Sequence, residues 1–401
     1  MEDVVAPPYD VITAADRETL LRRSPYNVVR LILPDAGDEA VVNDLFCQWQ
    51  REGVLVQEAQ PCLYRVEQDF VGPDGVRRTR TGVIALVRLE PYEARVVRPH
   101  ERTYSGPKAG RLRLLRATRA QLSPVFALYD DPSGRVEAAL AARAEHDAEI
   151  DVTDGQGTRH RLWRVVSGHE EVEAVLAGCP LLIADGHHRY ETALAYQAER
   201  SGSDDAPAGW TMMYLANACS PGLQIYPTHR VVLGVDAEVR ASLPGRLASL
   251  GFTVDARPGD DAAALARALD GAGSNPAAAI WRPGDVPLLV RLIDDAALNG
   301  APPTLRGLDV TAVDRLVLAR ALGIAADAAD RAERIVYRHR PAEATALADD
   351  RGEAVAVLLR APAVRDVEAV ADAGEVMPQK STYFYPKTVD GFVFYGLDAC
   401  T

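Results

Sequence analysis

The sequence is poor in cysteine, and its cysteines form no pattern typical of a cross-linked or zinc-bound fold. The chain of 401 residues contains five cysteines, an odd number, and no Cys-x-x-Cys pair. Disulfide-rich secreted domains use even sets of cysteines, and structural zinc sites use closely paired ones. The sequence therefore argues against a disulfide framework and against a structural zinc site.

Long hydrophobic runs are also missing. No stretch approaches the roughly 18 apolar residues that a membrane span requires. The acidic start Met1-Glu2-Asp3 differs from the basic and apolar start of a signal peptide. We therefore expect a cytoplasmic protein without a membrane partner.

Several common motifs of nucleotide-binding and hydrolytic enzymes are absent. The chain has no Gly-x-x-x-x-Gly-Lys-Ser/Thr run, no Gly-x-Gly-x-x-Gly fingerprint and no Gly-x-Ser-x-Gly elbow. These absences disfavour an ordinary P-loop, a Rossmann site and an α/β-hydrolase. The formal net charge of −13 argues against nucleic acid as the main partner, although a local basic patch stays open.

The sequence that remains has the composition of an ordinary globular protein, with 48% hydrophobic and 25% charged residues. Segments with helical spacing and segments with strand-like alternation follow one another, which predicts a mixed α/β fold. We expect a strand at 27–33, a helix at 39–52 and a hairpin that joins 63–70 to 80–89.

The stretch 181–194 carries the clearest chemical signal. It is typical of a short buried strand, a tight turn and the first turns of a helix. A helix N-terminus favours anions through its unpaired N–H groups and its dipole. Gly186 permits close backbone approach, and Arg189 offers a planar fork for phosphate oxygens. We therefore predict a nucleotide-phosphate site formed by Asp185, Gly186, His187, His188 and Arg189. The alternative is that one histidine caps the core while Arg189 pairs with a nearby acid.

A second polar stretch, 97–108, follows another predicted strand. Glu101 lies between two basic side chains, His100 and Arg102. In a phosphoryl-transfer reaction its carboxylate could accept the proton of an attacking hydroxyl. A plain salt bridge of Glu101 with Arg98 or Arg102 is an equally good interpretation.

Two neighbouring histidines could suggest a metal-binding site, but their spacing argues against one. His187 and His188 are adjacent, and adjacent helical side chains point about 100° apart rather than forming an i, i+4 chelate. We therefore predict no dedicated metal ligands. A magnesium ion held mainly by nucleotide phosphates is compatible with the sequence, since it needs only one or two protein carboxylates.

Two further stretches, 227–230 and 377–387, carry cationic and aromatic side chains. We expect their cations to hold a substrate carboxylate or the transferred phosphate. The predicted substrate-binding set is His100, Arg102, His229, Arg230, Lys380, Tyr383 and Lys387.

The ordered motifs of this chain resemble an uncharacterised bacterial and archaeal family, the domain of unknown function 1015. The matching stretches are 6–10, 99–103, 184–190, 227–230 and 377–387. Gln379 departs from the family pattern, in which a second proline is expected.

The Asp-Gly-His-His-Arg motif is also similar to the phosphate motif of the ParB/sulfiredoxin superfamily. That superfamily includes nucleotide-hydrolysing DNA clamps, sulfiredoxins and kinases of free serine. In the serine kinases a Pro-His-Glu sequence supplies the catalytic base, and Pro99-His100-Glu101 resembles it. The resemblance implies a ParB/sulfiredoxin-like nucleotide-binding core at 80–235. We expect an α/β segment at 1–79, an alanine-rich α/β subdomain at 236–345 and a C-terminal segment at 346–401 that returns to the site.

These observations together predict a nucleotide-dependent kinase of serine or a similar hydroxyl amino acid. Its catalytic residues would be Glu101 and His188, and its cofactors ATP or ADP with Mg²⁺. Two alternatives stay open: a phosphatase or other hydrolase that uses the same anion site, and a non-catalytic ParB-like module associated with nucleotide or DNA. The sequence leaves the nucleotide, the acceptor and the oligomeric state undetermined.

Overall fold

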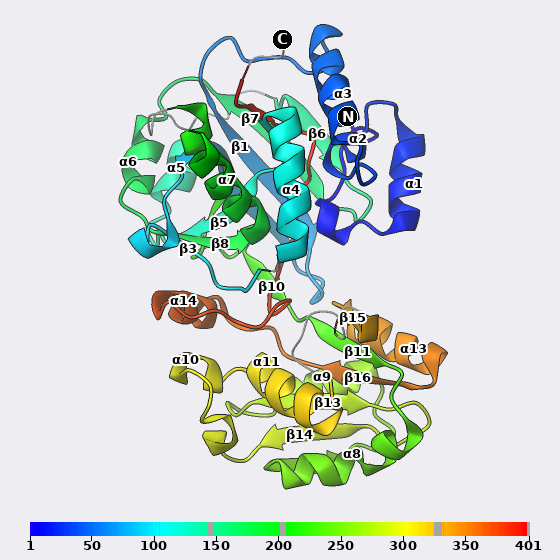
Figure 1. The fold of residues 1–401 in the computed structure, drawn as a ribbon. Coiled ribbons are helices and arrows are strands. Elements are labelled where there is room, and N and C mark those ends of the chain that lie inside the picture. The colour runs from blue at the N-terminus through cyan, green and yellow to red at the C-terminus, as the bar shows by residue number, and fades with distance from the viewer. Residues whose placement is uncertain (104, 143–146, 201–205, 325–330, 332, 399–401) are drawn as a thin grey trace. The chain divides into compact units, whose positions relative to one another are not determined.

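The computed structural model describes residues 1–103, 105–142, 147–200, 206–324, 331 and 333–398, and it has the mixed α/β architecture that the sequence predicts (Figure 1). Its internal contacts group the chain into two compact units. Unit 1 comprises Met1–Pro99, Thr103–Gln224 and Phe384–Thr401, and unit 2 comprises His100–Arg102 and Ile225–Tyr383. The four segments expected from the sequence stay a prediction.

Unit 1 is built on an eight-stranded mixed sheet with the strand order β3-β8-β5-β9-β2-β1-β7-β6. Its strands are β1 (Leu63–Val71), β2 (Arg77–Arg88), β3 (Val97–Arg98), β5 (Val125–Tyr129), β6 (Ile150–Thr153), β7 (Arg159–Val165), β8 (Leu181–Asp185) and β9 (Trp210–Asn217). The β3–β8 and β5–β9 pairs are parallel, and β8 pairs antiparallel with β5. The predicted hairpin is confirmed as β1 and β2. A separate two-stranded ladder joins β4 (Ala120–Gln121) to β18 (Tyr395–Gly396).

The helices of unit 1 include the predicted helix α3 and the helix that follows β8. They are η1 (Tyr9–Val11), α1 (Ala14–Arg23), α2 (Val29–Ile32), α3 (Glu39–Arg51), η2 (Tyr92–Ala94), α4 (Ser105–Thr118), α5 (Arg135–Ala141), α6 (Glu170–Leu176), α7 (His187–Glu199) and η3 (Pro207–Gly209). Helices α4 and α7 lie side by side, and α3 packs on α4 (Figure 1). Buried Val125, Ile183 and Tyr190 join the central strands to α7 in one hydrophobic core. This core gives the end of β8 and the start of α7 a rigid support.

The strand expected at 27–33 is wrong, because this segment forms helix α2. Asn27 is fully buried, and its Oδ1 accepts a hydrogen bond of 3.0 Å from the N–H of Val29. The Asn27 amide also donates to the carbonyls of Asp3 and Val5. The bond to Val29 satisfies an N–H group at the start of the helix, and the two donated bonds hold Asn27 against the N-terminal segment. Val29, Leu31 and Ile32 are all buried. The apolar residues of this run therefore show neither helical nor strand-like periodicity, and the pattern does not distinguish a helix from a strand.

Unit 2 is built on a six-stranded, fully antiparallel sheet with the order β12-β14-β13-β16-β11-β15. Its strands are β11 (His229–Leu233), β12 (Phe252–Ala256), β13 (Ala277–Trp281), β14 (Leu288–Leu292), β15 (Ile335–Arg338) and β16 (Ala354–Leu358). Its helices are α8 (Ala237–Ser249), α9 (Ala262–Asp270), η4 (Asp295–Leu298), α10 (Pro303–Arg306), α11 (Asp309–Ala312), the π-helical η5 (Val313–Ala321), α13 (Pro341–Arg351) and α14 (Val364–Asp372). Small side chains such as Ala279 and Ala356 let α9 and α13 pack closely against this sheet.

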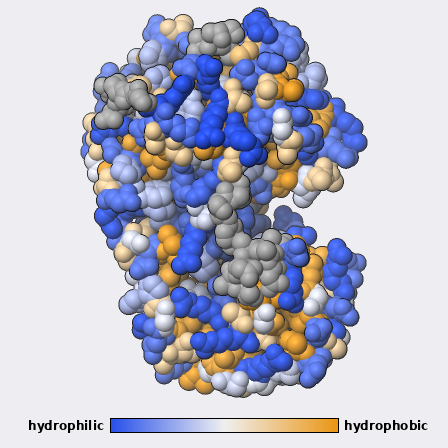
Figure 2. All heavy atoms as spheres, in the orientation of Figure 1, coloured by the Kyte–Doolittle hydropathy of each residue, from blue (hydrophilic) through white to orange (hydrophobic). Residues whose placement is uncertain are grey.

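Two short strands, β10 (Gln224–Tyr226) and β17 (Tyr383–Tyr385), pair with each other in a separate two-stranded sheet. Cys62, Cys179 and Cys219 are not disulfide-bonded, whereas Cys47 is disulfide-bonded. In the part of the chain that the structure describes, no helix is both long enough and apolar enough to cross a membrane. Hydrophobic residues on the face drawn in Figure 2 are scattered among hydrophilic ones.

Candidate functional site

The predicted strand, turn and helix are confirmed as β8, Gly186 and α7. Gly186 precedes the first residue of α7 and has φ +90°, a left-handed conformation that favours glycine. A Cβ at this position would lie 2.8 Å from Nε of Arg189. The guanidinium therefore packs directly over the glycine at the start of the helix. His187 is buried, whereas His188 is half-buried, so His188 is the more accessible of the two histidines.

Arg189 is the central cation of this turn. Its side chain is only 10% exposed and lies 4.0 Å from the Asp185 carboxylate. Its Nη1 donates to the carbonyl of Pro124, but its buried Nε has no hydrogen-bond partner among the described residues. Burial lowers the pKa of Arg189, yet the carboxylates of Asp185, Asp390 and Asp10 outweigh burial and leave this pKa above its ordinary value. Arg189 is therefore a fixed cation with a donor to spare.

Lys387 supplies a second cation at the same turn. Its Nζ donates to Oδ2 of Asp185 over 2.8 Å, and both side chains are only 14% exposed. The other carboxylate oxygen, Oδ1, accepts a 2.8 Å hydrogen bond from the N–H of Gly186. Asp185 therefore joins the end of β8, the turn and the C-terminal segment.

The N-terminal segment reaches the same place. The guanidinium of Arg111 lies 4.2 Å from the ring centre of Tyr9 and donates to the carbonyl of Ile32. Tyr9, Arg111 and Arg189 line a cavity of about 60 Å³ whose other walls include side chains of α4 and α7 and of the segment 120–125. Burial raises the pKa of Tyr9, so its hydroxyl stays protonated. The motif around Pro7-Pro8-Tyr9-Asp10 thus lies at the candidate site.

Asp390 is a site residue that no motif of the sequence singles out. It is 1% exposed, and its backbone pairs with that of Ala6 through two hydrogen bonds, of 2.8 and 3.2 Å. Burial raises the pKa of Asp390 to about 7, against the opposing effects of Arg189 and Ser123. This carboxyl therefore titrates near neutral pH beside the central cation.

Glu101 lies in unit 2 and contacts the segment around Met377. It forms an isolated parallel bridge with Met377, whose N–H donates to the carbonyl of His100 over 2.8 Å. Oε2 of Glu101 accepts a hydrogen bond of 3.4 Å from the N–H of Ser381. The ring of His100 is fully buried and its Nε2 lies 2.9 Å from Oγ1 of Thr382.

Arg230 is a buried cation of unit 2. It is 4% exposed, and its Nη2 donates to the carbonyl of Lys380 over 3.1 Å. Burial lowers its pKa, while Tyr337, Asp314 and Glu101 raise it. Arg230 and the Glu101 carboxylate, which belong to the same unit, therefore attract each other electrostatically.

His229 is a neutral donor next to Arg230 in the chain. Its Nδ1 accepts a 3.2 Å hydrogen bond from the N–H of Leu359, so the ring proton resides on Nε2. That buried Nε2 has no partner among the described residues. Burial, with the charges of Arg230 and His339, lowers the pKa of His229 to about 3.

The predicted site residues thus fall into two groups. Unit 1 contains Asp185, Gly186, His187, His188, Arg189 and Lys387, and unit 2 contains His100, Glu101, Arg102, His229, Arg230, Lys380 and Tyr383. Arg102 is exposed, and Tyr383 stacks on His339 with 3.6 Å between ring centres. Lys380 and Lys387, which belong to one predicted loop, separate into different units. Among the described residues no group of three or more His, Cys, Asp and Glu side chains could hold a metal ion.

Comparison with known proteins identifies the family. The family model described as a protein of unknown function (DUF1015) matches residues 1–310. The chain belongs to this family. No curated protein sequence matches it.

Among solved structures, the chain is similar to proteins with and without a described activity. A conserved hypothetical protein from Pyrococcus furiosus is 15% identical at a TM-score of 0.39, with 77% of this chain and 94% of that chain covered. A free serine kinase variant in complex with AMP is 14% identical at a TM-score of 0.40, with 75% of this chain and 86% of that chain covered. C-terminally truncated SbnI from Staphylococcus aureus is 14% identical at a TM-score of 0.38, with 77% of this chain and 85% of that chain covered.

Proposed function

We propose that this protein is a nucleotide-dependent kinase of a small hydroxyl-bearing molecule, such as serine or a similar amino acid. The observation that supports the proposal most strongly is the Arg189 guanidinium. It is fixed over Gly186 at the start of α7, and its buried Nε has no partner among the described residues. A phosphate oxygen is the acceptor that matches both this donor and the positive end of the helix.

The nucleotide would be ATP or ADP, with its phosphates against Gly186, His188 and Arg189. Magnesium would be held mainly by those phosphates, as in sites that supply few protein ligands. When bound, the ion would neutralise phosphate charge. His188, the more accessible histidine of the turn, would donate to the transferred phosphoryl group as its charge develops.

Glu101 would act as the general base. The acceptor hydroxyl oxygen bonds to the terminal phosphorus of the nucleotide while the bond from that phosphorus to its bridging oxygen breaks. The hydroxyl proton passes to the Glu101 carboxylate, and the nucleotide leaves one phosphate shorter. Arg230 and His229, a buried cation and a neutral donor of unit 2, would hold the carboxylate of the amino acid acceptor. Lys380, Tyr383, His100 and Arg102 would complete the substrate side.

The reaction can be tested by phosphorus NMR. Wild-type protein is incubated with ATP, ADP or CTP, with and without a panel of hydroxyl amino acids. A new phosphomonoester signal that requires both nucleotide and acceptor is expected. Phosphate release without an acceptor would instead support a hydrolase, and salt-sensitive DNA binding without turnover would support a nucleic-acid module.

A variant at Glu101 separates binding from transfer. Glu101→Gln should bind nucleotide with unchanged affinity and transfer phosphate at least about 100-fold more slowly, because it lacks the proton acceptor. Glu170→Gln, on the exposed first turn of α6, is the matched control and should transfer at the wild-type rate. Full transfer by Glu101→Gln would remove Glu101 from the role of base.

A further inference from the structure

Arg80 on β2 is a buried cation whose charge no described acidic residue balances by an ion pair. Its side chain is fully buried, and the guanidinium lies 4.6 Å from the ring centre of Phe126 and 5.5 Å from that of Tyr214. Burial lowers the pKa of Arg80, which expresses the cost of removing a charge from water. A buried charge is tolerated only where its donors are satisfied.

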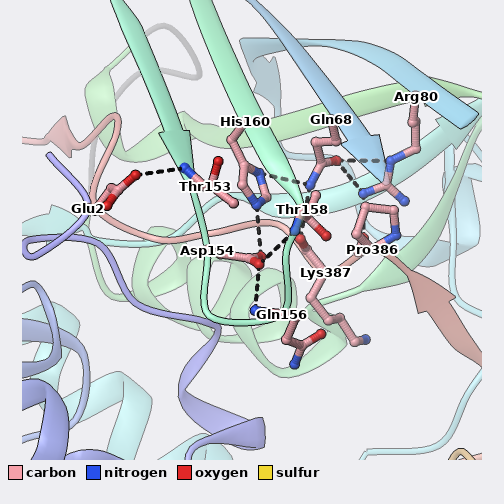
Figure 3. Close-up of polar contacts among 10 residues, drawn as sticks. All are labelled: Glu2, Gln68, Arg80, Thr153, Asp154, Gln156, Thr158, His160, Pro386 and Lys387. Carbon is pink, nitrogen blue, oxygen red and sulfur yellow. Dashed lines mark hydrogen bonds and ion pairs between the residues drawn. The ribbon is translucent and has the colours of Figure 1, made fainter. Parts of the chain in front are cut away.

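The donors of Arg80 reach one short backbone segment. Nη1 donates to the carbonyl of Tyr385 over 3.3 Å, and Nη2 donates to the carbonyl of Pro386 over 2.5 Å. Gln68 on β1 extends the same clamp, since its Nε2 donates to the carbonyl of Lys387 over 3.0 Å (Figure 3). Side chains of two adjacent strands thus hold the carbonyls of residues 385, 386 and 387 in succession.

A hydrogen-bonded chain fixes the orientation of Gln68. Its Oε1 accepts from Nε of Arg80 at 3.0 Å, so its Nε2 faces Nδ1 of His160 at 3.2 Å. Because that Nδ1 must accept, the ring proton of His160 lies on Nε2, which donates to Oδ2 of Asp154 over 2.9 Å (Figure 3). The donor and acceptor roles in this hydrogen-bonded series are therefore fixed. The Gln68 amide cannot flip without losing its bonds to both Arg80 and His160.

Residues 385–387, whose carbonyls Arg80 and Gln68 hold, place Lys387 at the candidate phosphate site. The Lys387 backbone is held by Gln68, and its Nζ reaches Oδ2 of Asp185 at 2.8 Å, next to Gly186. We propose that Arg80 is a positioning residue, which acts with Gln68 through the backbone of residues 385–387 to hold the Lys387 ammonium beside the phosphates of a bound nucleotide. The part that concerns nucleotide rests on the proposed function, whereas the placement of Lys387 does not.

The placement is tested without any nucleotide. In protein with ¹³C,¹⁵N-labelled lysine, the Nζ signal of Lys387 is assigned by its loss in Lys387→Met, and its ion pair with Asp185 by the shift that Asp185→Asn causes. Arg80→Met should produce the same shift. Gln68→Glu, which keeps an acceptor for Arg80 but loses the donor to Lys387, serves as the second variant if Arg80→Met does not fold. Arg78→Met is the control, because Arg78 pairs with Asp74 on the hairpin turn. A Lys387 signal that stays at its wild-type position in a folded Arg80 or Gln68 variant would overturn the proposal.

The effect on ligand is tested by a double-mutant cycle with ADP as the probe. Arg80→Met and Lys387→Met should each weaken ADP binding about tenfold, and the double variant should bind no more weakly than Lys387→Met alone. Independent, multiplying effects would show that Arg80 does not act through Lys387. If wild-type protein binds no ADP, the proposed function fails, while the NMR result for Lys387 still decides the positioning role.

Discussion

Buried charged residues determine the chemistry of the candidate phosphate site at the scale of single side chains. Arg189 keeps its charge because the carboxylates of Asp185, Asp390 and Asp10 act on it. Asp390 responds in the opposite way, since burial raises its pKa from 3.8 to about 7. The charge of the site therefore becomes more negative as pH rises through neutrality.

This raised pKa predicts a pH-dependent contribution to stability. A carboxyl whose folded pKa lies above its unfolded one contributes stability below the unfolded pKa of 3.8, and this stability is lost as pH rises through about 7. A shift of about three pKa units corresponds to about 4 kcal/mol at most. Asp390→Asn, which mimics the protonated acid, should remove this loss.

Denaturant unfolding of wild type and Asp390→Asn at several pH values between 4.5 and 8 measures the effect. The free energy of unfolding of Asp390→Asn relative to wild type should increase as pH rises. Asp398→Asn, at an exposed acid that pairs with Arg119 and Arg200, is the control and should show no such trend. Parallel pH profiles for wild type and Asp390→Asn would rule out a carboxyl that titrates near neutral pH.

The element on which the site depends is the junction of β8 and α7. Its glycine serves two purposes: it adopts a left-handed conformation, and it leaves space for Arg189. Gly134 at the start of α5 has φ +65°, and a Cβ added there would meet nothing within 4 Å. Both glycines therefore adopt a left-handed backbone conformation, but only Gly186 has a neighbouring side chain, that of Arg189, in the space of a Cβ atom.

Alanine substitutions separate these two requirements. Gly134→Ala should lower the free energy of unfolding by about 1 kcal/mol, because alanine is strained in the left-handed region, and Gly186→Ala should lower it by at least as much. Only Gly186→Ala should also weaken ADP binding, since its Cβ displaces the Arg189 guanidinium. Chemical denaturation and calorimetric titration measure the two quantities. Equal ADP affinity in both variants would mean that Arg189 does not contact the nucleotide.

Elements with strong local signals were predictable from the sequence. The β8–α7 junction has an apolar strand, a glycine and a helical pattern in succession, and the β1–β2 hairpin has clear alternation and a Gly-containing turn. The segment at 27–33 was not predictable, because β-branched residues favour strand by propensity while the buried Asn27 side chain organises a helical turn. The Asn27 amide also bonds to the carbonyls of Asp3 and Val5, which are distant in the sequence, and such bonds leave no periodic trace there.

At the scale of the whole molecule, the predicted site residues divide between two compact units. The residues proposed to hold phosphate lie in unit 1, and Glu101 with the proposed acceptor residues lies in unit 2. The motifs proposed a set of candidate site residues but not how these residues group, because contacts such as that of Lys387 with Asp185 join residues far apart in the sequence. Asp390 and Arg80 escaped prediction for the same reason: an aspartate and an arginine in ordinary surroundings gain their roles only through burial.

The central claim is that the start of α7 binds nucleotide phosphate through Arg189. Calorimetric titration of wild type, Arg189→Met and Arg113→Met with ADP tests it most directly, since Arg113 is exposed on α4 and pairs with Glu39. Wild type and Arg113→Met should bind ADP with equal affinity, and Arg189→Met should bind about 100-fold more weakly, as expected for the loss of a charge-assisted bidentate contact. An Arg189→Met protein that is folded and binds ADP as tightly as wild type would contradict the account.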